Sequence, residues 1–280
     1  IPVLPSEVLQ WLDPAPGKTL VDGTLGGGGH TRLLAERVCP DGLVIAVDRD
    51  PNALARAEKN LKGLPLKVAQ SNFRDLPEVL DTLDISHVDG ILLDLGLSSD
   101  QLADNDRGFS FDADGELDLR FDPESGEPAW RMLSRLSAEH LAQIIYEFGE
   151  ERFSRRIARK IVERRRERPI RSARDLADLV RSCVPKSKNH RIAPATRTFQ
   201  AFRIAVNQEL DSLRDALTRL PDRLAQGGHL AIISFHSLED RLVKVAFRED
   251  DRLKPLTRKP ICATEVEQQS NRRSRSARLR

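Results

Sequence analysis

The sequence contains few cysteines and no long hydrophobic run, and these absences exclude several classes of protein. Cys39, Cys183 and Cys262 are the only cysteines among 280 residues, and none belongs to a CxxC pair. Their odd number and wide spacing argue against a disulfide framework and a structural zinc site. No apolar run approaches the roughly 20 residues of a membrane span, which argues against an integral membrane protein. The first residues also lack the basic flank and apolar stretch of a signal peptide. We therefore expect a cytoplasmic protein with no metal and no membrane partner.

The charges are distributed unevenly along the chain. Residues 1–151 carry 13 basic and 28 acidic side chains, whereas the remaining residues carry 32 basic and 15 acidic ones, for a net charge of +2 overall. Such an asymmetry favours a surface in the second half that binds a polyanion such as nucleic acid. The alternative is that the helices of the second half simply expose basic faces to solvent.

Short apolar runs alternate with helical patterns in the first half, which is typical of βαβ units and a parallel sheet. Strands are predicted at 20–22, 43–48, 66–69 and 90–94. A fifth strand, 230–235, follows only after about 135 residues, far more than one crossover helix needs. The fold class is therefore α/β, a doubly wound sheet with an inserted segment.

The inserted segment has helical periodicity throughout. Ser137 and Ser172 are placed as N-caps of two of its helices. A regular pattern of apolar residues from Thr198 to Leu220 predicts one long helix that covers the sheet. We place the inserted helical domain at 103–195, between two segments of a sheet domain formed by 1–102 and 196–280.

A glycine-rich run, Gly26-Gly27-Gly28-Gly29-His30, lies between the first strand and a helix. Glycines allow close approach of a ligand, and the amides at a helix N-terminus favour anionic groups. Asp48 ends the second strand, where its carboxylate can accept hydrogen bonds from ribose hydroxyls. The combination predicts a site for an adenosine-containing cofactor.

The residues around the glycines separate three cofactors. A nucleoside triphosphate loop needs Lys-Ser/Thr after its last glycine, but this chain has His30-Thr31. A nicotinamide site needs a third glycine where Thr31 stands. Asp22, just before the glycines, is instead typical of enzymes that use S-adenosylmethionine. An oxidoreductase that uses NAD and a non-catalytic RNA-binding module are the two alternatives that we keep.

Eight motifs occur in the same order as in the MraW family, which the sequence resembles nearly from end to end: DGTLGGGGH, DRDP, DGILLDLGLSS, RGFSF, GEERFSRRIARKIV, PATRTFQAFRIAVNQEL, SFHSLEDR and RSRSARLR. The resemblance implies a class I (Rossmann-like) methyltransferase fold with an inserted helical domain that recognises the substrate. It also implies transfer of a methyl group from S-adenosylmethionine to the N4 amine of a cytosine in 16S ribosomal RNA, near the decoding site of the small ribosomal subunit.

The resemblance also implies a set of residues that bind the cofactor: Gly28, Gly29, His30, Asp48, Phe73, Asp94 and Gln101. Asp94, at the end of the fourth strand, is placed to meet the ammonium group of the cofactor or to serve as a catalytic acceptor. Phe73 follows the third strand and could pack on the adenine, although it could equally be a core residue. Asp100 stands where the family has proline, a change that affects the backbone before Gln101.

Candidate substrate residues lie elsewhere in the sequence. Many N4-amine methyltransferases have a Pro-Pro-aromatic motif after the fourth strand, and this chain lacks one, so Phe109 and Phe111 are the candidates to hold the base. No G-x-S-x-G elbow accompanies His236, which argues against a hydrolase and favours either base contact or a helix cap. Arg155, Arg156 and Arg159 belong to a basic helix that we expect to bind RNA phosphates.

Overall fold

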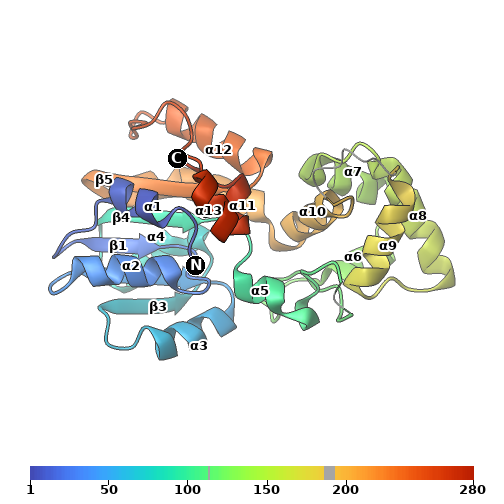
Figure 1. The fold of residues 1–280 in the computed structure, drawn as a ribbon, viewed down its shortest axis with the longest axis horizontal. Helices are drawn as coiled ribbons and strands as arrows, with labels where there is room; N and C mark the ends of the chain where they lie inside the picture. Colours follow the sequence, from blue (N-terminus) through green and yellow to red (C-terminus); the bar gives the residue numbers. More distant parts are fainter. Residues whose placement is uncertain (113, 186–192) are drawn as a thin grey trace. The chain divides into compact units, whose positions relative to one another are not determined.

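The computed structural model describes residues 1–112, 114–185 and 193–280. The chain forms two compact units, the first made of residues 1–98 and 210–280 and the second of residues 99–209 (Figure 1). The sequence predicted 103–195 for the insert, so the second unit extends further at both ends. Most of the difference arises from the helix after residue 195, which packs within the second unit.

The first unit contains one six-stranded sheet with the order β3-β2-β1-β4-β5-β6. Strands β1 to β5 are parallel and β6 is antiparallel to β5. All five predicted strands are present, and the fifth begins earlier than predicted, at Leu224. The strands are β1 (Thr19–Asp22), β2 (Leu43–Asp48), β3 (Leu66–Gln70), β4 (Val88–Asp94), β5 (Leu224–Ser234) and β6 (Arg278–Leu279).

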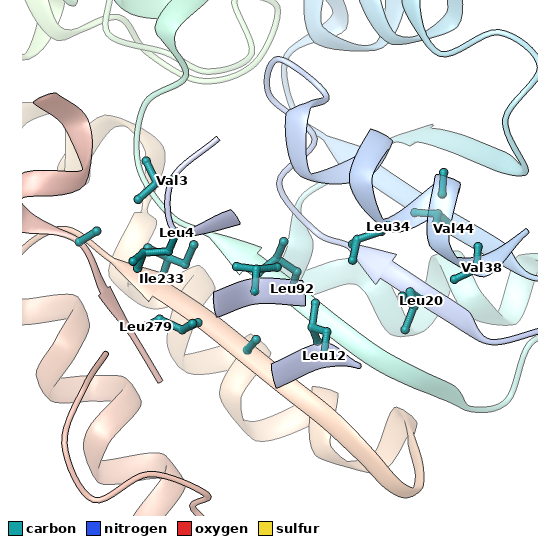
Figure 2. Packing of buried hydrophobic residues seen from close by; sticks show 14 of the residues in the cluster. Val3, Leu4, Leu12, Leu20, Leu34, Val38, Val44, Leu92, Ile233 and Leu279 are labelled. Atoms are coloured by element: carbon teal, nitrogen blue, oxygen red, sulfur yellow. The ribbon is translucent and has the colours of Figure 1, made fainter. Parts of the chain in front are cut away.

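Apolar side chains cover both faces of this sheet because alternate residues of a strand point to opposite faces. Leu20 and Leu92 pack on one face with α1 and α2 (Figure 2), whereas Val21 and Ile91 pack on the other with α4 and α11. The sheet is therefore doubly wound, as predicted. Its helices are α1 (Pro5–Leu12), α2 (Gly29–Val38), α3 (Pro51–Asn60), η1 (Phe73–Asp75), α4 (Leu76–Thr82), α11 (Glu209–Arg219), η3 (Leu220–Arg223), α12 (Ser237–Glu249), α13 (Glu265–Ser270) and η4 (Arg272–Ser276).

The second unit is helical in the part that the structure describes. Ser137 caps α7 and Ser172 caps α9, each accepting a hydrogen bond from a backbone amide, which confirms both predicted N-caps. Its core contains apolar residues of several helices, including Leu141, Ile157 and Phe202. The helices are α5 (Ser99–Ala103), η2 (Asn105–Arg107), α6 (Ala129–Arg135), α7 (Ala138–Gly149), α8 (Ser154–Glu167), α9 (Ala173–Cys183) and α10 (Thr196–Asn207).

The single helix predicted from Thr198 to Leu220 is wrong, because the chain forms α10 and α11 with a break between them. Gln208 lies in the left-handed region at φ 52° and ends α10. Asn207 fixes the break, since its Oδ1 accepts from the Phe121 amide at 2.8 Å and its Nδ2 donates to a carbonyl at 2.7 Å. The apolar pattern is continuous, but α10 packs against α7 whereas α11 covers the sheet.

The helices also bear on whether the chain could span a lipid bilayer. Within the described ranges, no helix combines the length and the apolar character needed to cross a membrane.

Candidate functional site

The strand order of the first unit identifies one edge of the sheet as the place for a ligand. From β1 the sheet continues to β2 and β3 on one side and to β4 and β5 on the other. In open parallel sheets, ligands bind at the carboxyl ends of the strands where the order reverses. Asp22 and Asp94 end the two strands at this point, and Asp48 ends the next one. Three carboxyl groups therefore share this edge of the sheet.

The glycine-rich loop after β1 has a backbone conformation and close contacts that residues with side chains would not tolerate. Gly26 and Gly28 have φ values of 50° and 75°, in the region that favours glycine. A Cβ atom at Gly23 would lie 2.4 Å from Leu93 Cδ2. Gly28 is the N-cap of α2 and supplies no side chain to cap the first amides. The N-terminus of α2 therefore presents backbone donors that suit an anionic group.

Asp22 ties the two ends of this loop together. Its Oδ1 accepts from the Thr24 amide at 3.1 Å, and its Oδ2 accepts from Thr31 Oγ1 at 2.6 Å. Burial raises the pKa of the Asp22 carboxyl, and the hydrogen bonds from Thr31 and Thr24 oppose that rise. The acidic residue that precedes the glycines therefore shapes the loop from inside, a role that the sequence did not indicate.

Asp48 also anchors the loop. Its Oδ2 accepts from the Gly26 amide at 2.7 Å, and its Oδ1 accepts from the Asp50 amide at 2.9 Å. Burial raises the pKa of the Asp48 carboxyl. The predicted position at the end of β2 is confirmed. The predicted contact with a ribose stays a prediction, and the two backbone hydrogen bonds add a structural function.

His30 and Asp94 face each other across the start of α2 and the end of β4. Their atoms Nε2 and Oδ2 are 3.7 Å apart. His30 Nε2 and Asp94 Oδ1 are buried, and neither has a hydrogen-bond partner among the described residues. A buried polar group without a partner costs about 1–3 kcal/mol. The pair therefore gains free energy from any ligand that supplies the missing partners.

The protonation states of this pair follow from burial. Burial lowers the pKa of His30 to about 4, which keeps the imidazole neutral near pH 7. Burial raises the pKa of Asp94 to about 7, and the nearby carboxyl groups of Asp22 and Glu239 add to the rise. The Arg273 guanidinium opposes it. Asp94 is therefore a carboxyl group that a bound cation would ionise.

Arg273 was not among the predicted site residues. It lies in η4, close enough to Asp94 to lower the pKa of that carboxyl, and its guanidinium donates to the Leu97 carbonyl. The end of the chain joins the sheet as β6, which pairs with β5. Arg278 and Arg280 also form ion pairs with Asp240 of α12 at 2.8 and 2.7 Å. The only signal for this region in the sequence is a cluster of five arginines between Arg272 and Arg280.

Phe73 begins η1, directly after β3 and the short link that follows it. The ring is half-buried and packs against the apolar cluster that covers one face of the sheet. Its Cβ lies 3.3 Å from the place where a side chain at Gly23 would begin. Phe73 is thus both a core residue and a neighbour of the loop, and its contact with the adenine stays a prediction.

His236 is the N-cap of α12. Its Nδ1 accepts from the Glu239 amide at 3.4 Å, and the Glu239 side chain accepts from the His236 amide at 3.3 Å. This reciprocal arrangement confirms the helix-capping alternative. Glu239 is buried and was not predicted, although its carboxylate lies near enough to Asp94 to raise the pKa of that residue.

The other predicted residues belong to the second unit. Gln101 is buried in α5. Phe109 is buried and stacks on Phe121, with ring centroids 6.0 Å apart. Phe111 is half-buried and contacts Phe199 edge to face at 4.8 Å. The basic residues of α8 are exposed, as predicted: Arg155, Arg156 and Arg159.

Comparisons with known proteins agree along the whole chain. A family model described as the MraW methylase family matches residues 1–280. A protein of Rhodopirellula baltica named ribosomal RNA small subunit methyltransferase H is 53% identical over 291 residues, covering 100% of this chain and 90% of its own length. A protein of the same name from Deinococcus radiodurans is 51% identical over 281 residues, covering 100% and 88%. A solved rRNA methylase from Streptococcus thermophilus matches 98% of this chain and 90% of its own with a TM-score of 0.44 and 12% identity.

Proposed function

Since this chain belongs to the MraW methylase family and uses S-adenosylmethionine, we propose that it methylates the N4 amine of one cytosine in 16S ribosomal RNA. Its relatives are named as methyltransferases of small-subunit ribosomal RNA, which supports the RNA substrate. The position near the decoding site rests on the family resemblance in the sequence. S-adenosylmethionine as cofactor rules out the NAD-dependent alternative, and a methylase family argues against a module that only binds RNA.

The facing side chains of His30 and Asp94 carry the proposal. S-adenosylmethionine has an ammonium group and a sulfonium centre, both positive, and a ribose with two hydroxyls. The buried Oδ1 of Asp94 has no partner among the described residues and is a suitable acceptor for the ammonium group. The first amides of α2, which no side chain caps, suit the carboxylate of the same molecule. The residues present therefore fit the cofactor.

The remaining cofactor contacts follow the same edge of the sheet. Asp48 would hold the ribose hydroxyls, and Phe73 would pack on the adenine. Gln101 belongs to the second unit, and its contact with the cofactor stays a prediction. Among the loop residues predicted to contact the cofactor, Gly29 and His30 would contribute their backbone amides. The Gly28 amide already donates to the Leu25 carbonyl at 2.7 Å, so Gly28 would contribute only close approach of its backbone.

The reaction needs positioning more than acid–base chemistry. When bound, S-adenosylmethionine supplies an electrophilic methyl group. The cytosine amine would form a nitrogen–carbon bond as the carbon–sulfur bond breaks, with S-adenosylhomocysteine as the leaving group and the amine proton passing to solvent or to a carboxylate acceptor. Its lone pair is delocalised into the ring, so holding the amine in line with the methyl group is the main contribution of the protein. Asp94 is the candidate to accept a hydrogen bond from the amine, if it is not occupied by the ammonium group.

The second unit supplies the candidate RNA contacts. Phe111 is half-buried and can present an edge to a base, whereas Phe109 is enclosed by its contact with Phe121. His236, in the first unit, keeps Nε2 as a candidate for base contact, although this atom also lies 3.1 Å from Glu239 Oε1. The target cytosine has to be unstacked, because a base inside a duplex is out of reach. We assign phosphate contacts to the exposed arginines of α8: Arg155, Arg156 and Arg159.

The experiment combines methyl transfer with identification of the product. Small ribosomal subunits from a bacterium that lacks its own relative of this enzyme are incubated with the protein and isotopically labelled S-adenosylmethionine. Nuclease digestion and mass spectrometry should detect label in N4-methylcytidine at a single position of the 16S RNA. Label in another nucleoside would disprove the N4-cytosine assignment, and absence of label in RNA would disprove the substrate. An Asp94→Ala variant provides the inactive control.

A further inference from the structure

An open groove of about 830 Å³ lies between α7 and α8 of the second unit. Both helices belong to that unit and pack against each other (Figure 1). The groove is therefore formed within this unit alone. The residues that matter here are Tyr146 from α7, Arg155 and Arg159 from α8, and Arg152 from the link between the helices. The sequence predicted phosphate contacts for Arg155 and Arg159, but it did not predict that Tyr146 contacts RNA.

Tyr146 is the feature that most needs an explanation. It is the only tyrosine of the chain, and 64% of its surface is exposed although it lies on a well-packed amphipathic helix. Four other residues of the same helix line the groove, and two of them, Ala138 and Ala142, are small and leave space beside the ring. An aromatic ring placed beside open space can stack on a flat partner such as a nucleobase.

The groove is also positively charged. Arg155 and Arg159 are exposed one helical turn apart, and neither has an acidic partner within the described ranges. Arg152 places its guanidinium 4.6 Å from the centre of the Phe153 ring, which holds that charge at the end of the groove. Glu139 is the single acidic residue that lines it, and hydrogen bonds from its own amide and from Ser137 lower the pKa of this carboxyl. Three arginines and one glutamate leave the groove with net positive charge.

We propose that this groove binds a single-stranded segment of RNA, with a base stacked on Tyr146 and phosphates bound by Arg155 and Arg159. Proteins bind single strands through such combinations of an aromatic platform and a cationic track. A duplex offers no free base face, so Tyr146 would contribute nothing to its binding. The proposal rests on the proposed function in one respect, which is that the substrate is RNA.

The size of the groove suits a short stretch of RNA. Its volume of about 830 Å³ lies within the range of roughly 300–1,000 Å³ typical of ligand sites, and a nucleotide fills a large part of such a site. The groove contains no side chain assigned to cofactor binding. The role that we propose for the groove is therefore to bind RNA and not to take part in methyl transfer. The bases that it holds need not include the methylated cytosine.

The test uses two labelled RNA probes, an unstructured oligouridine of about 12 nucleotides, within the usual site sizes of roughly 4–16 nucleotides, and a duplex of matching length. Affinities are measured by fluorescence anisotropy at several salt concentrations. Tyr146→Ala should weaken single-strand binding by about 5- to 150-fold, the range expected for loss of one stacked base, and leave the salt dependence unchanged. Tyr146→Phe keeps the ring and should retain binding. Arg155→Ala with Arg159→Ala should lower the salt slope by roughly 0.7 for each phosphate that the variant no longer binds.

Arg156 provides the matched control. It is exposed on the same helix but does not line the groove. Arg156→Ala should weaken the binding of single-stranded RNA and of the duplex by equal factors. Tyr146→Ala should weaken only the binding of single-stranded RNA. Circular dichroism of each variant checks that the helices remain folded.

Other outcomes would overturn the proposal without touching the proposed function. Equal loss of duplex and single-strand binding in Tyr146→Ala would contradict stacking, and so would wild-type binding by that variant. Competition by polyglutamate but not by oligouridine would assign the groove to an acidic peptide instead. Wild-type protein that fails to methylate small-subunit RNA would instead refute the proposed function. If the wild-type protein methylates small-subunit RNA and the groove variants also bind and methylate it normally, the proposal for the groove is refuted and the proposed function stands.

Discussion

The two units present their polar side chains in opposite ways. At the carboxyl edge of the sheet, Asp22 is buried, Asp48 is half-buried, and both accept hydrogen bonds from the loop that they support. On α8, Arg155 and Arg159 are exposed and have no acidic partner among the described residues. Rigid, desolvated groups suit a small cofactor of fixed shape, whereas exposed cations suit a polyanion whose counterions are released on binding.

Asp94→Ala should have the largest effect and abolish methylation, because the substitution removes the ammonium partner or the catalytic acceptor. Asp94→Asn keeps the size of the side chain but not its charge. Steady-state kinetics with each variant separate the two roles, since loss of an ammonium partner raises the KM for the cofactor and loss of an acceptor lowers kcat. Turnover close to wild type in Asp94→Ala would rule out both.

Asp48→Ala should weaken S-adenosylmethionine binding by about 1–3 kcal/mol, the range for loss of a charged hydrogen-bond acceptor. The amides of Gly26 and Asp50 also lose their partner in this variant, so a lower free energy of unfolding should accompany the lower affinity. Calorimetric titration of the cofactor and denaturant unfolding measure the two effects. Affinity that stays at the wild-type value in a folded variant would remove Asp48 from the site.

Cofactor affinity should fall as the pH falls below about 7. The Asp94 carboxyl has a pKa of about 7 in the free protein, and only its ionised form attracts an ammonium group. Binding below pH 7 must therefore release a proton, and affinity should be about tenfold weaker near pH 6 than near pH 8. His30 stays neutral over this range because its pKa is about 4.

Calorimetry in two buffers of different ionisation enthalpy detects the released proton. Arg273→Ala removes a positive charge that lowers the pKa of Asp94, so the midpoint should move to higher pH. A binding profile that is flat between pH 6 and 8 would mean that Asp94 does not meet the cation.

Replacing Arg155, Arg156 and Arg159 together with alanine should leave cofactor affinity unchanged. The same variant should bind RNA more weakly, with a salt slope reduced by roughly 0.7–0.9 for each phosphate left unbound. Cofactor titration checks that the affinity for the cofactor is unchanged. RNA binding by the same preparation, measured at several salt concentrations, checks the reduced salt slope. An unchanged slope would mean that these arginines only solvate a helix face.

The positions of several candidate cofactor residues in the fold could be predicted from sequence because their signals are local. Asp22, Asp48 and Asp94 each end a short apolar strand, and the carboxyl ends of parallel strands meet at one edge. The glycine run is also a local signal, because the residues that adopt positive φ values are the glycines of the loop itself. The N-caps of α7 and α9 were found from Ser137 and Ser172 for the same reason.

What sequence reasoning missed depends on contacts between distant residues. The ion pairs of Arg278 and Arg280 with Asp240 join residues about 40 positions apart, and no local pattern indicates them. Arg273 approaches Asp94 from the other end of the chain. The break at Gln208 was hidden because apolar residues keep a helical period on both sides of it while facing different cores. Periodicity reports that a helix buries one face but does not report what covers that face.

The placement of the second unit between β4 and β5 sets the order in which the protein can fold during synthesis. Strand β5 begins at Leu224, after the entire second unit, so β4 has no neighbour on that side until most of the chain has left the ribosome. Its apolar residues Ile91, Leu92 and Leu93 stay uncovered on that edge during this time. A second unit that folds first shortens the loop that must close, which lowers the entropic cost of pairing β4 with β5. The insert is therefore positioned to assist assembly of the sheet that it interrupts.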